Sequence, residues 1–352
     1  MHIKSWARKK VQGIVGASDL KWRRPPVIDV RPSGGETRVY YLAPSGMTPS
    51  GGVRVIYRHV DMLNSMGISA AVLHDRNGFR CGWFENDTRL QQLDSLHFRA
   101  NDILVVPECY GPGLQFLPDD CRKMIFNQNA HHTFDQIPLN SSTAGHPLAG
   151  VHNILSLMTV SEDNAELLEY AFPDVRVEVV RNVVDSKLFH PGLEGQHRHA
   201  IGYVPTRRAH ELDQFLHIMR ASGALDDGQW EFLPVTGMSE LQVGQALQTC
   251  QLFVSLSEHE GFGLPAAEAM ASGCYVVGFA GGGGREFFDP SYCAPVEDLT
   301  GLVRETIAAL DRPQSELAEL GRKASAEILG RYSLDGLRVD LERIYERVLW
   351  SG

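Results

Sequence analysis

The sequence predicts an α/β protein built from two domains, each with a parallel sheet flanked by helices. The chain has 352 residues, which is about two domains of ordinary size. Hydrophobic residues make up 43% of it and charged residues 22%, as in a globular protein. Short apolar segments alternate along the chain with segments of helical periodicity, which is typical of parallel strands joined by helical crossovers.

The composition excludes a disordered chain, a collagen-like repeat and a small scaffold held by disulfides. The six cysteines form no CxxC pair and no cluster with zinc spacing, so we expect buried thiols in a reducing cytosol. No run of 18 apolar residues is present, and the basic start MHIKSWARKKVQG lacks the apolar core of a secretory signal. These features predict a cytoplasmic protein.

A first domain is expected over residues 37–190. Its first strand, 37–43, precedes a loop rich in Gly, Pro and Ser and then a helix over 53–66. Apolar residues recur in that helix every three or four positions, and Gly67 ends it. Ser161 is placed to cap the next predicted helix. Further apolar runs predict strands at 69–74, 102–107, 123–127, 155–160 and 175–180.

A linker is expected over 181–195, where Pro, Gly and polar residues cluster. The second domain is expected over 191–330, and 331–352 contains an amphipathic helix predicted to cross back onto the first domain. The second domain's strands are expected at 200–204, 230–234, 252–256 and 274–279, and its helices at 211–221, 241–249, 265–272 and 298–310. Two such domains facing each other leave a cleft at the carboxyl ends of their strands, where open α/β sheets bind ligands.

Residues 1–36 form a basic N-terminal extension with eight Lys or Arg against three Asp or Glu. Its net charge of +5 leaves −15 for the rest of the chain. This acidic body argues against nucleic acid as a partner. Two interpretations of the extension stay open. It is either a solvated or domain-packing segment, or a peripheral contact with an anionic membrane surface.

The most informative stretch is 252–288, where a buried strand ends and the loop EHEGFG leads into a helix. Pro265 suits the first helical position, because its missing N–H is not needed there. Free N–H groups and the dipole of that helix start favour an anion such as a diphosphate. Glu268, expected in the first turn, can accept hydrogen bonds from a vicinal diol such as that of a ribose. The glycines 281–284 would let a ligand approach backbone amides.

The segment EGFGLPAAE, from Glu260 to Glu268, resembles the E-x7-E signature of retaining family-4 glycosyltransferases. Weaker similarities follow the same order along the chain, over about residues 37–350. They are the glycine pair before Val53, the linker NVVDSKLFHP (182–191) and the segment GYVPTRRAHE (202–211). The resemblance implies the GT-B fold, in which two Rossmann-like domains face each other across a cleft and a C-terminal helix crosses back to the first.

The resemblance also implies roles for individual residues. Glu268 would bind the ribose of a nucleotide-sugar, and Arg207 and Arg208 would neutralise the diphosphate leaving group. Charge develops on that phosphate during transfer, and fixed cations there lower the barrier. The donor's sugar and phosphates would be surrounded by Glu260, the backbone of Gly261, Phe262, Gly263 and Leu264, and the glycines Gly51 and Gly52.

The family commonly has a His after the strand that is expected to end at Asn127. This chain has Gln128 there, with His131 and His132 a few residues later. Which of the three takes that place stays open, and His131 is the candidate included among the catalytic residues. No Asp-x-Asp pair occurs. Such pairs often hold a divalent cation in the other major glycosyltransferase fold, so we expect neither a metal nor a cofactor besides the donor substrate.

The sequence therefore predicts a retaining glycosyltransferase with a glycan, lipid-linked or small-molecule acceptor, typical of polysaccharide biosynthesis. Two alternatives stay open: a nucleotide-sugar epimerase or hydrolase on the same fold, and a non-catalytic subunit that binds nucleotide-sugar. A P-loop nucleotidase is excluded, because Gly52 and Val53 stand where Lys and Ser or Thr would be required. A Rossmann dehydrogenase is excluded, because PSGMTPSGG supplies no GxGxxG after the first strand.

Overall fold

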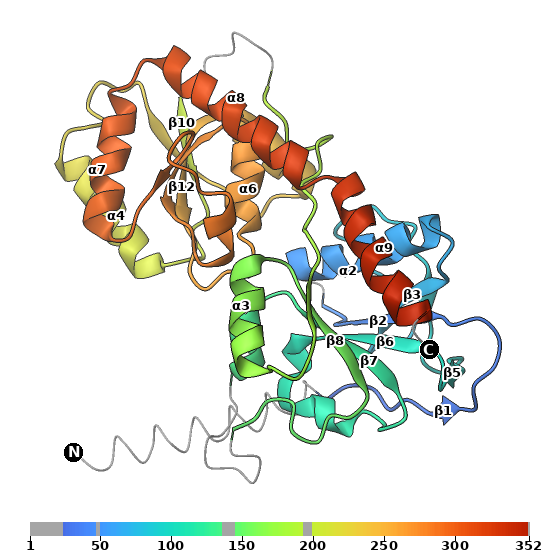
Figure 1. The fold of residues 1–352 in the computed structure, drawn as a ribbon. Coiled ribbons are helices and arrows are strands. Elements are labelled where there is room, and N and C mark those ends of the chain that lie inside the picture. Colours follow the sequence, from blue (N-terminus) through green and yellow to red (C-terminus); the bar gives the residue numbers. More distant parts are fainter. Residues whose placement is uncertain (1–23, 47–49, 136–144, 193–198, 351–352) are drawn as a thin grey trace, which may run out of the picture. The chain divides into compact units, whose positions relative to one another are not determined.

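The computed structural model describes residues 24–46, 50–135, 145–192 and 199–350, and the chain divides into two compact units (Figure 1). Unit 1 comprises the described residues of Met1–Thr159, Leu167–Glu178 and Ile344–Gly352, and unit 2 comprises those of Val160–Glu166 and Val179–Arg343. Most of the basic N-terminal extension lies outside the described residues. The described helices include none that is both long and apolar enough to cross a membrane.

Unit 1 contains a parallel sheet with the strand order β4-β3-β2-β6-β7-β8-β9. Its strands are β2 (Val39–Ala43), β3 (Ala70–His74), β4 (Leu90–Gln91), β6 (Ile103–Pro107), β7 (Arg122–Asn127), β8 (Ile154–Thr159) and β9 (Val177–Val179). A separate pair consists of β1 (Val30–Arg31) and β5 (Phe98–Arg99). Central strands such as β2 and β6 are buried throughout, because helices and loops cover both faces of such a sheet.

Two α-helices connect strands of unit 1. α2 (Gly51–Ser65) joins β2 to β3 and buries its apolar stripe, including Ile56, Val60 and Leu63. α3 (Glu162–Ala171) follows β8, and the Ser161 hydroxyl accepts a hydrogen bond from the Asn164 N–H at 3.3 Å, so the predicted cap is confirmed. Its first residues belong to unit 2 and its last to unit 1.

Among the described residues, unit 2 contains a five-stranded parallel sheet with the order β11-β10-β12-β13-β14. Its strands are β10 (Ala200–Tyr203), β11 (Glu231–Pro234), β12 (Cys250–Leu256), β13 (Tyr275–Phe279) and β14 (Ala294–Pro295). Its helices are α4 (Ala209–Ala221), α5 (Glu240–Thr249), α6 (Leu264–Ala271), α7 (Leu299–Leu310) and α8 (Gln314–Arg331). All seven residues of β12 are buried, so the loop that follows it starts from the centre of the sheet.

The last helix, α9 (Leu334–Trp350), begins in unit 2 and ends in unit 1. In unit 1, the Tyr345 hydroxyl donates a hydrogen bond to the Tyr41 hydroxyl of β2 at 3.0 Å, and both rings are buried. Arg122 Nη2 donates to the Val348 carbonyl at 2.9 Å. In unit 2, the Asp340 carboxylate accepts three hydrogen bonds from the backbone and guanidinium of Arg181.

Candidate active site

The candidate site of unit 2 is formed by three loops at the carboxyl edge of its sheet. Tyr203 at the end of β10 pairs with Val254, and Leu256 at the end of β12 pairs with Phe279 of β13. The segments 204–208, 257–263 and 280–284 therefore leave adjacent strands at the same edge. This is where open parallel sheets bind ligands.

The predicted glycine tract packs against the loop after β12. The Glu260 N–H donates to the Gly281 carbonyl at 2.7 Å, and the Gly283 N–H donates to the Glu260 carbonyl at 3.1 Å. A Cβ on Gly283 would lie 2.0 Å from the Gly261 carbonyl oxygen. We expected these glycines to admit a ligand, but here the close approach of protein backbone is what requires Gly283.

Replacing Gly283 by alanine is therefore expected to destabilise the fold by about 1–3 kcal/mol, the usual cost of overpacking a closed site. Chemical denaturation would measure the loss. Gly284→Ala is the matched control, because the nearest atom to a Cβ there is a Phe288 ring carbon at 3.4 Å, an ordinary contact. Equal stability of the two variants would contradict the close packing of loop on loop.

The helix start after this loop leaves several backbone N–H groups available. Gly263 is the N-cap with φ of 96°, a left-handed conformation that suits glycine. Leu264 is the first helical residue and Pro265 the second, one position later than predicted. Within the described part of the chain, no acceptor is found for the N–H groups of Gly261, Phe262, Gly263 and Leu264.

Glu268 lies in the interior of unit 2. It is the fifth residue of α6 and so begins the second helical turn, whereas the sequence predicted the first. The residue is only 9% exposed. Charged residues are seldom buried to this degree unless they have partners, so its burial distinguishes it from the solvated acids of an ordinary helix face.

Arg207 and Glu260 form an ion pair at the mouth of this site. Arg207 Nε lies 2.9 Å from Glu260 Oε1, and the two side chains are 55% and 15% exposed. Together with Pro265 they line a pocket that holds about 250 Å³ of empty space, open solvent included. The other lining residues are Val204, Phe253, Val254, Ser255, Leu256 and Ser257. The pocket thus places a cation beside the amino end of α6.

Arg208 has different surroundings from Arg207. Its backbone is left-handed, with φ of 39°, at the N-cap of α4. Its Nε donates to the Ser257 carbonyl at 3.2 Å, its Nη1 lies 2.7 Å from Glu211 Oε2, and the guanidinium stacks 4.1 Å from the Phe279 ring centroid. These contacts tie three segments of the edge together, so Arg208 supports the loops that surround Arg207.

Two residues that the sequence did not assign to the site hold the same loop. The Ser161 hydroxyl and the Asn164 amide both donate to the Gly261 carbonyl, at 2.6 and 2.5 Å. Both donors are buried. Fixing the Gly261 carbonyl also fixes the direction of the Phe262 N–H, because the two groups belong to the same planar peptide. No local signal predicts their contact with Gly261, because they lie about 100 positions before it.

Unit 1 brings Gly52 and Gln128 together at the amino end of α2. Gln128 Nε2 donates to the Gly52 carbonyl at 3.0 Å, and a Cβ on Gly52 would lie 3.1 Å from that side chain. Gly51 is the first residue of the helix. His132 is exposed and bonds to Asp135 at 2.6 Å. Of the three candidates for the family's His, the structure thus places Gln128 against α2, and the role of His131, in the 3₁₀ turn η2 (Ala130–Phe134), stays a prediction.

Residues 232–325 match a family model described as Glycosyl transferases group 1. The match includes Glu260, the turn after it, Glu268 and the glycine tract. This segment is therefore similar to a glycosyl transferases group 1 domain. Arg207 and the whole of unit 1's sheet lie before it.

Two curated proteins are similar to this chain beyond the group 1 domain. An alpha-1,6-glucosyltransferase of Actinobacillus pleuropneumoniae is 24% identical over 249 residues, which cover 66% of this chain and 69% of the relative. An MMP alpha-(1->4)-mannosyltransferase of Mycolicibacterium hassiacum is 27% identical over 233 residues, which cover 56% of this chain and 55% of the relative. The chain thus spans about half the length of the second.

Solved structures resemble the fold over most of the chain. Sucrose-phosphate synthase from Thermosynechococcus elongatus aligns with a TM-score of 0.64 at 13% identity, covering 90% of this chain and 100% of the other. A glycosyltransferase from Rickettsia africae aligns with a TM-score of 0.62 at 14% identity, covering 91% and 100%. The predicted fold class of two Rossmann-like α/β units is confirmed.

Proposed function

We propose that this protein transfers a sugar from a nucleotide-diphosphate sugar to a hydroxyl of a glycan, lipid-linked or small-molecule acceptor, with retention at the anomeric carbon. One observation carries the proposal. A cation, Arg207, lies near the start of α6, where backbone N–H groups have no hydrogen-bond acceptor among the described residues. The cation and the N–H groups are both complementary to a diphosphate, and the segment that matches the group 1 family includes the N–H groups.

The donor's phosphates would lie against the turn from Gly261 to Leu264. Four N–H groups there have no acceptor among the residues that the structure describes, and the positive end of the α6 dipole favours an anion by about 0.3–1 kcal/mol. Glu260, beside the turn, would face the sugar hydroxyls while its carboxylate orients Arg207. A charged guanidinium held this way need not reorganise when the phosphate departs.

The chemistry needs little from the protein beyond this electrostatic environment. The bond from the anomeric carbon to the phosphate oxygen breaks, and the bond to the acceptor oxygen forms on the same face of the sugar. The departing phosphate oxygen would accept the acceptor's proton, so no separate general base is assigned. Fixed cations and backbone dipoles would balance the phosphate charge without a metal.

The structural neighbours suggest which donor to test first. HepE from Anabaena was solved with UDP and glucose, and the pneumococcal O-GlcNAc transferase GtfA with UDP and GlcNAc. We therefore propose UDP-sugars as the first probes, with GDP- and dTDP-sugars beside them. The same proposal includes a cytoplasmic enzyme with a lipid-linked acceptor. Its basic N-terminal extension would contact the anionic surface of the membrane that holds this acceptor.

Glu268→Ala is expected to weaken nucleotide binding by about 1–3 kcal/mol, because a buried carboxylate that bonds the ribose hydroxyls would be lost. Calorimetric titration measures this change in binding free energy, with the nucleoside diphosphate that stabilises the wild type as the ligand. Glu297→Ala, an exposed acid of the same unit, is the matched control. Wild-type affinity in the Glu268 variant would remove the ribose role.

Release of labelled nucleotide from donor, with and without acceptor extract, tests the function itself. A transferase releases nucleotide only when the acceptor is present. A hydrolase releases nucleotide from the donor alone, an epimerase converts the donor's sugar into its epimer without net release of nucleotide, and a binding subunit leaves the donor unchanged. The anomeric configuration of the isolated product, read from its proton coupling constants, decides between retention and inversion.

A further inference from the structure

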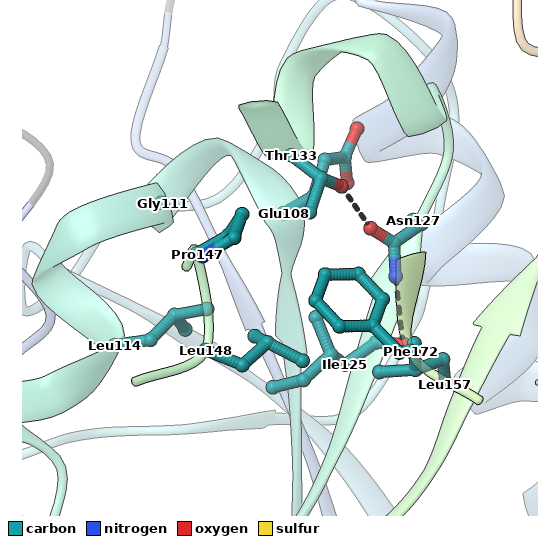
Figure 2. A pocket seen from close by; sticks show the side chains of 10 residues that line it. All are labelled: Glu108, Gly111, Leu114, Ile125, Asn127, Thr133, Pro147, Leu148, Leu157 and Phe172. Carbon is teal, nitrogen blue, oxygen red and sulfur yellow. Dashed lines mark hydrogen bonds between the residues drawn. The ribbon is translucent and has the colours of Figure 1, made fainter. Parts of the chain in front are cut away.

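Glu108 is a buried acid that none of the roles above uses. It directly follows β6, is 6% exposed and lines a small pocket in unit 1 (Figure 2). Its Oε1 accepts a hydrogen bond at 3.0 Å from the N–H of Asn129, which lies in the turn that follows the adjacent strand β7. Its Oε2 is buried and has no hydrogen-bond partner among the described residues. A buried acid with one oxygen left without a hydrogen-bond partner is costly to maintain, so a role beyond packing is expected of it.

The loop that Glu108 contacts, residues 127–133, is also held by hydrogen bonds within itself. The Asn129 side chain accepts a hydrogen bond from the His131 N–H at 3.1 Å and caps η2. The Thr133 hydroxyl donates to the Asn127 side-chain oxygen, which fixes the other end of the turn (Figure 2). The remaining walls of the pocket are mainly apolar, from Leu114, Ile125, Leu148, Leu157 and Phe172.

Gln128 stands between the two fixed asparagines. Because the backbone is held on both sides, its side chain has a defined direction, and its Nε2 reaches the Gly52 carbonyl at 3.0 Å. Gly52 leaves room for it, with a Cβ there only 3.1 Å from the amide. This contact lies at the positive end of the 15-residue helix α2.

We infer that Glu108 is a positioning residue, which holds the turn after β7 so that Gln128 stays at the amino end of α2 in the geometry that sugar transfer requires. The inference rests on the proposed function, since it assigns Gln128 to the substrate-binding edge of unit 1. Glu108 itself would touch no substrate. Its carboxylate acts through the Asn129 N–H.

A double-mutant cycle tests this. Glu108→Ala is expected to lower kcat/KM about 10- to 100-fold, as misplacement of a positioned group by an ångström does. Gln128→Ala is expected to do the same, and the double variant no more than either single one, because both changes remove one arrangement. Glu108→Gln keeps an oxygen for the Asn129 N–H and is expected to restore most of the activity. Effects that multiply in the double variant would overturn the inference.

A matched control separates positioning from mere support of the core. Leu114→Ala opens the same pocket and removes no hydrogen bond of the loop, so it should lower the melting temperature while kcat/KM of the folded protein stays near wild type. Glu108→Ala with unchanged kcat/KM and only a lower melting temperature would reject the positioning role.

Crystal structures of the variants give a readout that does not depend on activity. In Glu108→Ala the Gln128 amide should leave the Gly52 carbonyl, and in Glu108→Gln it should remain. An unmoved Gln128 in Glu108→Ala would contradict the inference. If the wild type shows no transfer at all, the proposed function fails, and the crystal structures still decide whether Glu108 positions Gln128.

Discussion

Arg207→Ala is expected to lower kcat by about 10²- to 10³-fold with little change in stability. A fixed donor or cation aimed at the charge that develops in the transition state typically contributes that much. The fold has little need of it. Arg207 is 55% exposed and its partner Glu260 is 15% exposed, so the ion pair is open to solvent on the Arg207 side and is expected to contribute about 1 kcal/mol. The variant should therefore unfold like the wild type.

Steady-state kinetics at saturating donor, together with thermal melting, measure both quantities. Arg304→Ala is the matched control. Arg304 is 69% exposed and pairs with Glu305 at 3.1 Å on α7. It should retain both kcat and melting temperature. Arg208→Ala provides a contrast, since its ties to Ser257, Glu211 and Phe279 predict a loss of stability as well. Full activity in Arg207→Ala would contradict the role on the leaving phosphate.

Glu108→Gln is expected to change how the stability of the protein depends on pH. Burial raises the pKa of the Glu108 carboxyl from its ordinary value of 4.5 to about 7, although backbone N–H groups and His132 oppose the rise. Below pH 4.5 the folded and unfolded chains both keep the proton. Between pH 4.5 and 7 only the folded chain keeps it, so the wild type loses about 3 kcal/mol of unfolding free energy across that window. Above pH 7 the loss is complete and constant.

Urea denaturation at a series of pH values measures the difference between variant and wild type. Glutamine does not titrate, so Glu108→Gln should gain about 3 kcal/mol relative to wild type from pH 4 to pH 8. Glu297→Gln, which removes one negative charge from an exposed position, controls for net charge. If the Glu108→Gln and wild-type curves run parallel over this range, the folded protein does not retain the Glu108 proton there.

The fold could be predicted from the sequence because its elements are strongly patterned. Buried strands such as β6 and β12 are mainly apolar, and their predicted bounds differ from the structure by one or two residues. The segment 311–334 received no prediction, yet α8 fills most of it. Its mixed composition gives a weak amphipathic pattern, and packing against the sheet stabilises it instead.

The candidate site could be predicted only where its signal is local. The turn from Glu260 to Glu268 carries its own chemistry in consecutive residues. Other contacts join segments that are not neighbours in the chain. They are the hydrogen bonds from Ser161 and Asn164 to Gly261 and from the Asn129 N–H to Glu108. A single sequence gives no signal for such contacts. Which of Gln128, His131 and His132 takes the place of the family's His stays a prediction. The contact of Gln128 with Gly52 depends on backbone geometry that one sequence does not reveal.

Thermal melting with nucleoside diphosphates tests the central claim most directly, because a ligand that binds the folded protein raises its melting temperature. UDP, GDP and dTDP would be compared at equal concentration on the wild type, Glu268→Ala and Glu297→Ala. We expect at least one of them to raise the melting temperature of the wild type and of Glu297→Ala by several degrees, and that of Glu268→Ala by much less. No stabilisation by any of the three, or an equal rise in all the proteins, would contradict a nucleotide-sugar site at α6.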